Sequence, residues 1–77
     1  MAEIDIKKLK SLRANKRLTQ LEVAKALGYE TALGYHHIES GKTTLRADQA
    51  YILSEMFNVE IKDLFFTQNV SAVETIY

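Results

Sequence analysis

Several residue types are missing from this sequence or scarce in it, and each absence narrows the possibilities. The 77 residues include no cysteine, which excludes a disulfide framework and a thiolate metal site. They also include no proline, and no low-complexity segment or repeat suggests a linker. The longest apolar run, residues 50–53, is far below the ~20 residues that a membrane-spanning helix needs.

The length and the N-terminus narrow the class of protein further. A chain of 77 residues is too short to bury two hydrophobic cores, so we expect one domain. Residues 1–8 place no apolar stretch after their charges, which excludes a signal peptide. The sequence therefore predicts a soluble, cytoplasmic domain.

The two halves of the chain carry opposite charges, although the net charge is zero. Residues 1–46 hold nine Lys or Arg and five Asp or Glu, a balance of +4. Residues 47–77 hold one Lys and five Asp or Glu, a balance of −4. This asymmetry is typical of a basic face with an acidic end, and two ordinary solvated surfaces would explain it equally well.

Apolar spacing and end signals predict an all-α domain over residues 1–66, with no strand before residue 68. The expected helices begin near Ile6, cover residues 20–27, 32–40 and 47–57, and follow Glu60. Residues 67–77 have neither a two-residue nor a helical period. We expect them to form a short tail, with a dimerisation arm as the alternative.

The helix over residues 20–27 has the clearest boundaries. Thr19 can accept a hydrogen bond from the backbone of Glu22 while the Glu22 side chain reaches back, which makes a capping box. Leu18 and Val23 have the spacing of a hydrophobic staple. Gly28 can end the helix in the left-handed conformation.

The next helix, over residues 32–40, has Thr31 as its expected N-cap and Gly41 as its end. Tyr35 and Ile38 lie three residues apart and are expected to point inward.

Two more helices follow. The first is expected to bury Ala50, Leu53 and Phe57 and to end at Asn58 in the left-handed conformation. The second, short helix is expected to have Glu60 as its cap and Asp63 at its third position, with Val59 and Leu64 as a staple.

Two short helices joined by a tight turn form a helix-turn-helix. The residues resemble the lambda-repressor-like, Cro/CI-type (XRE) DNA-binding family. The matching elements are Leu18-Thr-Gln-x-x-x-Ala24-x-x-Leu27-Gly28, Ile38-Glu-Ser-Gly-Lys42 and Phe57-Asn-Val-x-Ile-x-x-Leu-Phe65. The resemblance covers residues 6–66 and implies a compact five-helix domain with a short C-terminal tail.

The resemblance also implies roles for individual residues. Gln20 matches a glutamine that clamps a DNA phosphate, and Lys42 and Ser40 match positions near phosphates. Arg13 and Glu39 match a buried or half-buried pair that ties the first helix to the recognition helix. In addition, Ala24 matches an alanine that lets the two helices approach closely. The sequence departs from the family at Arg46 and Glu60, which occupy N-cap positions where Ser or Thr is usual.

With Tyr35 and Ile38 inward, the opposite side of the helix over residues 32–40 faces outward, and in this family it enters the major groove. Gly34 either lets this helix approach a neighbour closely or is a tolerated weak point. The expected DNA-contacting residues are Arg17, Gln20, Thr31, Ala32, Leu33, His36, His37, Ser40, Lys42 and Thr43.

The adjacent His36 and His37 raise two other possibilities. Neighbouring residues diverge by about 100° on a helix, so they cannot chelate one metal as an i, i+4 pair does. Neither has an orienting acid or a defined pocket beside Ser40, so catalysis is not expected. Contact with DNA is the favoured interpretation, and two merely solvated side chains are the alternative.

The sequence thus predicts a DNA-binding transcriptional regulator from a bacterium or phage, most simply a repressor. It is expected to bind a palindromic operator in double-stranded DNA as a homodimer. No enzyme activity, cofactor, metal or membrane contact is expected. Apolar residues near Leu45, Val59 and Phe65-Phe66 could form the dimer surface, although Val59 and Phe65 also suit the core. The alternative is a protein-interaction module, such as an antitoxin or antirepressor-type partner, that uses the same fold and binds a protein through the C-terminal tail.

Overall fold

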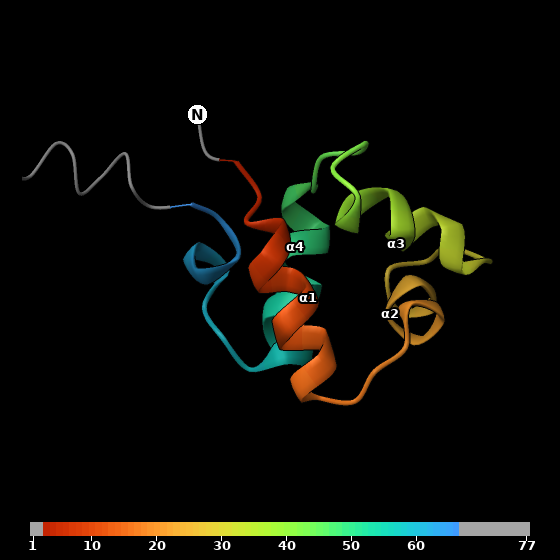
Figure 1. Ribbon diagram of the computed structural model, residues 1–77, viewed down its shortest axis with the longest axis horizontal. Coiled ribbons are helices and arrows are strands. Elements are labelled where there is room, and N and C mark those ends of the chain that lie inside the picture. Colours follow the sequence, from red (N-terminus) through yellow and green to blue (C-terminus); the bar gives the residue numbers. More distant parts are fainter. Residues whose placement is uncertain (1–2, 67–77) are drawn as a thin grey trace, which may run out of the picture.

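A computed structural model of the chain describes residues 3–66 (Figure 1). Over these residues the chain folds into four α-helices and one 3₁₀ turn, so the prediction of an all-α domain is confirmed. The elements are α1 (Ile6–Asn15), α2 (Gln20–Ala26), α3 (Ala32–Glu39), α4 (Ala47–Phe57) and η1 (Ile61–Leu64). The expected tail, residues 67–77, lies outside the described residues.

The prediction of a fifth α-helix is wrong, because η1 is a four-residue 3₁₀ helix. Its first turn forms as expected, with the Glu60 backbone N–H donating to Asp63 Oδ2 at 3.0 Å. The chain then becomes extended at Phe65, which forms an isolated antiparallel bridge with Ile4. The Phe66 N–H donates to the Glu3 carbonyl at 2.8 Å, so pairing with the N-terminal segment takes the backbone groups that a longer helix would use.

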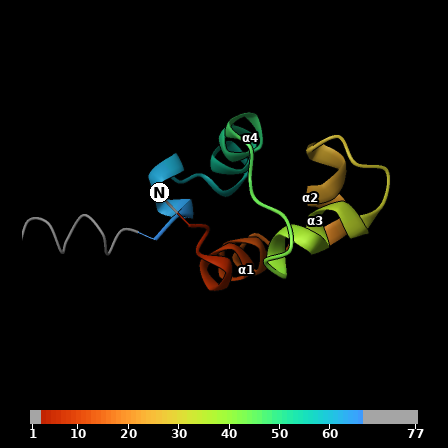
Figure 2. The ribbon, with the colours of Figure 1, turned by 90° about the horizontal axis from the view of Figure 1, so that it is seen from above.

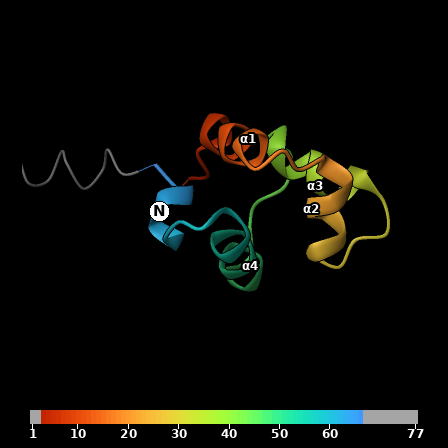
Figure 3. The ribbon, with the colours of Figure 1, turned by 90° about the horizontal axis from the view of Figure 1, so that it is seen from below.

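The elements are arranged along the molecule from one end to the other. Helices α2 and α3 pack against each other at one end, and η1 lies at the other end, where it packs against α4 (Figure 1). Figures 2 and 3 separate α1 from α4, which overlap in Figure 1, and show both lying between these ends. The core contains apolar residues from all four α-helices, from Leu27 after α2 and from η1, namely Leu9, Val23, Ala24, Leu27, Tyr35, Ile38, Ala50, Leu53, Phe57 and Leu64. None of the described helices combines the length and the apolar composition needed to cross a bilayer.

The ends of α2 and α4 agree with the sequence signals. The Glu22 N–H donates to Thr19 Oγ1 at 3.1 Å and the Thr19 N–H donates to Glu22 Oε1 at 2.7 Å, so the capping box is present. Gly28 follows with φ +96°, and Asn58 ends α4 with φ 58°. Arg46 stands where Ser or Thr is the usual N-cap of α4 in the family. The start of α4 is instead held by Gln49, whose Oε1 accepts the Arg46 N–H at 3.0 Å.

The residues expected at a dimer surface lie mostly against the core. Leu45, Val59 and Phe65 are half-buried and pack on the core cluster, whereas Phe66 is 40% exposed. Three of these four side chains therefore already have an intramolecular role.

Candidate nucleic-acid interface

Helix α3 has one buried face and one open face, as its sequence predicts. Tyr35 and Ile38 are fully buried. On the other side Leu33 is 56% exposed and His36 is exposed, while His37 is half-buried. The two imidazole rings lie side by side, with centroids 6.3 Å apart and planes tilted by 49°. An exposed leucine at the start of a helix has no role in the core and is available for an external contact.

The N-terminus of α3 is open. Thr31 occupies the N-cap position in extended conformation, as predicted, but its side chain makes no capping hydrogen bond. It is exposed, and Ala32 beside it is half-buried. The Thr31 hydroxyl and the first backbone N–H groups of α3 are therefore available to an external acceptor.

The C-terminus of α3 is closed by the backbone of His37. Its carbonyl oxygen accepts hydrogen bonds from Ser40 Oγ at 3.1 Å, the Lys42 N–H at 2.9 Å and the Thr43 N–H at 3.2 Å. Gly41 makes this turn possible with φ +84°. The side chains of Ser40, Lys42 and Thr43 are exposed. The backbone and the Ser40 hydroxyl hold the loop, and the side chains of Lys42 and Thr43 remain open to solvent.

A buried carboxylate joins three helices behind this surface. Glu39 of α3 is 1% exposed and accepts from Arg13 Nε of α1 at 2.7 Å and Arg13 Nη2 at 3.3 Å. It also accepts from Gln20 Nε2 of α2 at 3.0 Å. Arg13 Nη1 donates to the Leu18 carbonyl at 2.8 Å. The expected Arg13–Glu39 pair is thus confirmed, and its link to Gln20 is an addition that the sequence did not predict.

The protonation states follow from this network. Burial by itself would raise the pKa of the Glu39 carboxyl, but hydrogen bonds from Arg13 and Gln20 outweigh it, so that pKa lies below its ordinary value. Burial first, and then the Glu39 carboxylate, raise the pKa of Tyr35. The Tyr35 hydroxyl makes no hydrogen bond of ordinary geometry within residues 3–66. Glu39 is therefore ionised and Tyr35 neutral at physiological pH.

Gln20 occupies the position for which the family resemblance implies a phosphate clamp. Its amide nitrogen has two N–H donors, and Glu39 engages one of them. The other makes no hydrogen bond within the described part of the chain. Arg17, the other expected backbone contact on this side, is exposed and adopts a left-handed conformation with φ 56° in the turn after α1.

A family model described as helix-turn-helix matches residues 9–64, which covers all four α-helices in part or in full and η1. The chain belongs to this helix-turn-helix family. It is the XRE-type, Cro/CI-like family of DNA-binding domains, and the resemblance that the sequence motifs indicate is confirmed. No curated protein and no solved structure gives a significant match to the chain.

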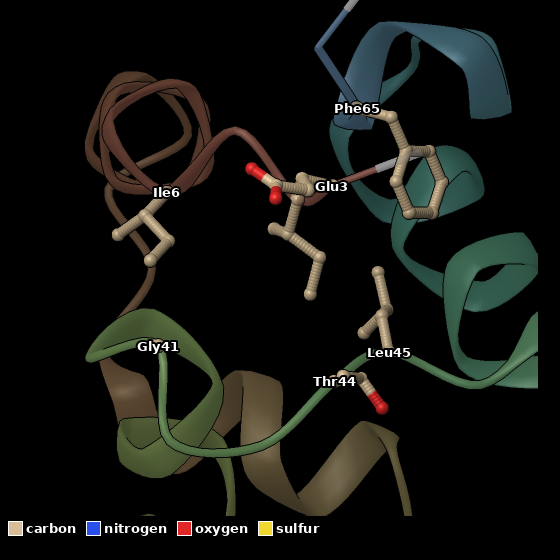
Figure 4. Close-up of a pocket in the computed structure, with 7 residues that line it drawn as sticks. Glu3, Ile6, Gly41, Thr44, Leu45 and Phe65 are labelled. Carbon is tan, nitrogen blue, oxygen red and sulfur yellow. The ribbon is translucent and has the colours of Figure 1, made fainter. Parts of the chain in front are cut away.

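An open hollow of about 620 Å³ lies on another part of this helix-turn-helix domain, between the N-terminal segment and the loop after α3 (Figure 4). Apolar atoms of Ile6, Leu45 and Phe65 line much of it, and Glu3 and Thr44 supply its polar side chains. Within residues 3–66 no three His, Cys, Asp or Glu side chains come together as a metal site.

Two residues that support the recognition helix were not predicted from the sequence. Tyr29, in the turn before α3, packs on the core and its hydroxyl accepts from Gln49 Nε2 at 2.8 Å. Gln49 is a glutamine with only 1% exposure. Its place three residues after the N-cap of α4 was the available signal, because a Gln there reaches back to the cap backbone.

Proposed function

We propose that this protein is a sequence-specific transcriptional regulator, a repressor, that binds a palindromic operator as a homodimer. The supporting observation is the open face of α3, where Leu33 and His36 are exposed, in a domain of a DNA-binding family. The buried Tyr35 and Ile38 fix which side of the helix is presented.

In this proposal the contacts divide into two classes. Base edges in the major groove are read by the first turns of α3, with Leu33 and Ala32 against thymine methyl groups and Thr31, His36 and His37 as hydrogen-bonding groups. Phosphates are held by residues around the helix ends, namely Arg17, Gln20, Ser40, Lys42 and Thr43. Glu39 supports the proposal because it holds the Gln20 amide so that one N–H remains for a phosphate oxygen.

The size of the reading surface supports the proposal of a dimer. One recognition helix covers only a few base pairs, and two copies on half-sites one DNA turn apart give the selectivity that a genome requires. A dimer bound over a promoter blocks polymerase by occupancy alone.

The first test is selection of bound duplexes from a random pool, followed by titration of the selected duplex at several salt concentrations. We expect an enriched palindrome with half-sites about 10 base pairs apart and an affinity that falls steeply with salt. A folded protein that enriches no sequence would refute sequence-specific reading. It would favour the interaction-module alternative, which pull-down with and without residues 67–77 would then examine.

Point variants separate base reading from general binding. Leu33→Ala and His37→Ala should weaken binding to the selected duplex by about 5- to 150-fold each, the equivalent of one base contact. Lys62→Ala is the matched control, because Lys62 is exposed on η1 at the opposite end of the domain from α3 (Figure 1). Equal losses for Leu33→Ala and Lys62→Ala would contradict the assignment of α3 as the reading helix.

A further inference from the structure

The ring of Tyr29 lies directly against Gly34 in the first half of α3. A Cβ atom added to Gly34 would lie 2.3 Å from Tyr29 Cγ and 2.4 Å from Tyr29 Cδ1, far inside van der Waals contact. Gly34 is not among the positive-φ glycines, which are Gly28 and Gly41. Its glycine is therefore required by space and not by backbone conformation.

Tyr29 is also held at its other end and at its backbone. Its hydroxyl accepts from Gln49 Nε2 at 2.8 Å, and Gln49 Oε1 accepts from the Arg46 N–H at the start of α4. Its backbone N–H donates to the Ala24 carbonyl of α2 at 2.9 Å. One residue in the turn, through its backbone and its side chain, thus connects α2, α3 and the N-terminus of α4.

The contacts of Tyr29 take the place of the N-cap hydrogen bond that α3 lacks. The N-cap residue Thr31 makes no side-chain hydrogen bond, so the first turn of α3 lacks the usual cap that holds it. The contact of Tyr29 with Gly34 lies one turn further on and faces the same segment. The position of Thr31 and Leu33 therefore depends on where the Tyr29 ring sits.

We propose that Tyr29, seated on Gly34 and hydrogen-bonded to Gln49, is a positioning residue that places the first turn of α3 for base reading. The inference rests on the proposed function and names the residue that holds the reading helix in the position that base contacts require. Hydrogen bonds to base edges weaken steeply when distance or angle changes, whereas charge attraction to phosphate tolerates displacement. Displacing Tyr29 therefore weakens recognition of the selected duplex and leaves general DNA affinity intact.

The decisive experiment is a double-mutant cycle on Gly34 and Tyr29, with binding measured to the selected duplex and to an unrelated duplex. Gly34→Ala should weaken specific binding by about tenfold or more, the equivalent of one base contact, with unchanged non-specific affinity and salt slope. In the Tyr29→Ala background the same substitution should have little further effect, because the ring it would strike is gone. An equal effect of Gly34→Ala in both backgrounds overturns the proposal, as does an equal loss of specific and non-specific binding.

A second variant and a measurement without DNA cover the case in which Gly34→Ala does not fold. Tyr29→Phe removes only the hydroxyl, and with it the hydrogen bond from Gln49, and keeps the ring on Gly34. It should weaken binding to the selected duplex and leave binding to an unrelated duplex unchanged. In the NMR spectrum of the free wild-type chain, the Gly34 Hα signals should be shifted by the ring current of Tyr29. Tyr29→Phe should shift the amide signals of residues 31–33, and no such shift overturns the proposal.

DNA binding and the NMR signals together show whether the proposed function fails or the role of Tyr29 fails. If no duplex is selected but the amide signals of residues 31–33 move, the proposed function fails and Tyr29 still places the turn. If a palindrome is selected and the cycle shows no coupling, the proposed function stands and the role of Tyr29 is refuted.

Discussion

Removing Arg13 should be the most damaging single change to the network behind the recognition helix. Arg13→Met keeps most of the side-chain volume but leaves Glu39, which is 1% exposed, with Gln20 as its remaining donor. Breaking a buried ion pair from one side costs about 3–5 kcal/mol, because an uncompensated charge stays in the interior. Natural domains have a total unfolding free energy of about 5–15 kcal/mol, so this loss is a large fraction. For a domain of this size it lowers the melting temperature by about 12 °C or more.

A substitution of Glu39, the other residue of the ion pair, shows whether the buried charge causes the loss of stability. Glu39→Gln keeps the shape and removes the charge, and Arg13 can then still reach water because its side chain is 21% exposed. Glu39→Gln alone should cost about 1–3 kcal/mol for the weakened hydrogen bonds. In the Arg13→Met background, however, it should be stabilising, because it removes the buried charge that causes the penalty. A Glu39→Gln substitution that destabilises Arg13→Met as much as it destabilises the wild type would refute this reasoning.

The pH dependence of the unfolding free energy checks the same explanation independently. In the wild type the pKa of Glu39 is lowered, so its contribution to stability is present above the unfolded pKa and is lost as pH falls through the folded pKa. In Arg13→Met we expect burial to dominate and to raise that pKa, so the penalty is present at neutral pH and disappears on acidification. Urea unfolding at a series of pH values should therefore show the two proteins converging as pH falls. Asp48→Asn, which breaks the exposed Arg46–Asp48 pair at 3.2 Å, is the control and should shift the midpoint far less.

Three further predictions concern single side chains. Tyr29→Phe should lower the unfolding free energy by about 1–2 kcal/mol because it leaves a buried Gln49 N–H unpaired, whereas Tyr35→Phe should be neutral or stabilising because its hydroxyl makes no ordinary hydrogen bond among the described residues. Equal losses in thermal unfolding would contradict this contrast. Gly28→Ala should cost about 1–2 kcal/mol in urea unfolding from its φ of +96° alone, since nothing lies within 4 Å of the added Cβ, and an unchanged midpoint would refute that. Lys42→Ala should reduce the slope of log K against log salt by about 0.9 without changing the selected sequence, and an altered sequence preference would show base contact instead.

The helices and the core could be predicted from the sequence because their signals are local. The bounds of α4 follow from its apolar stripe and from Asn58, which has φ 58° as expected. The capping box of α2 and the inward Tyr35 and Ile38 were accessible for the same reason. The Arg13–Glu39 pair, 26 residues apart, was expected only through the family resemblance.

What could not be predicted depends on contacts between distant segments. A 3₁₀ turn, η1, stands in place of the expected fifth helix because residues 64–66 pair with residues 3–5. No sequence pattern near η1 predicts that pairing. Gly34 was interpreted either as a site of close approach or as a weak point, and the structure decides for close approach to Tyr29. The DNA-contacting residues remain a prediction, and three of them, Gln20, Ala32 and His37, are half-buried while the other seven are exposed.

The carbonyl of His37, which gathers three hydrogen bonds from the loop after α3, belongs to the main chain and is present whatever side chain stands at that position. Under the proposed function, substitutions on the outer side of α3 therefore change which bases are preferred without loosening the loop that carries Lys42. The proposed reading residues can on this account be varied in a selection for new DNA sequences while the turn after α3 keeps its conformation.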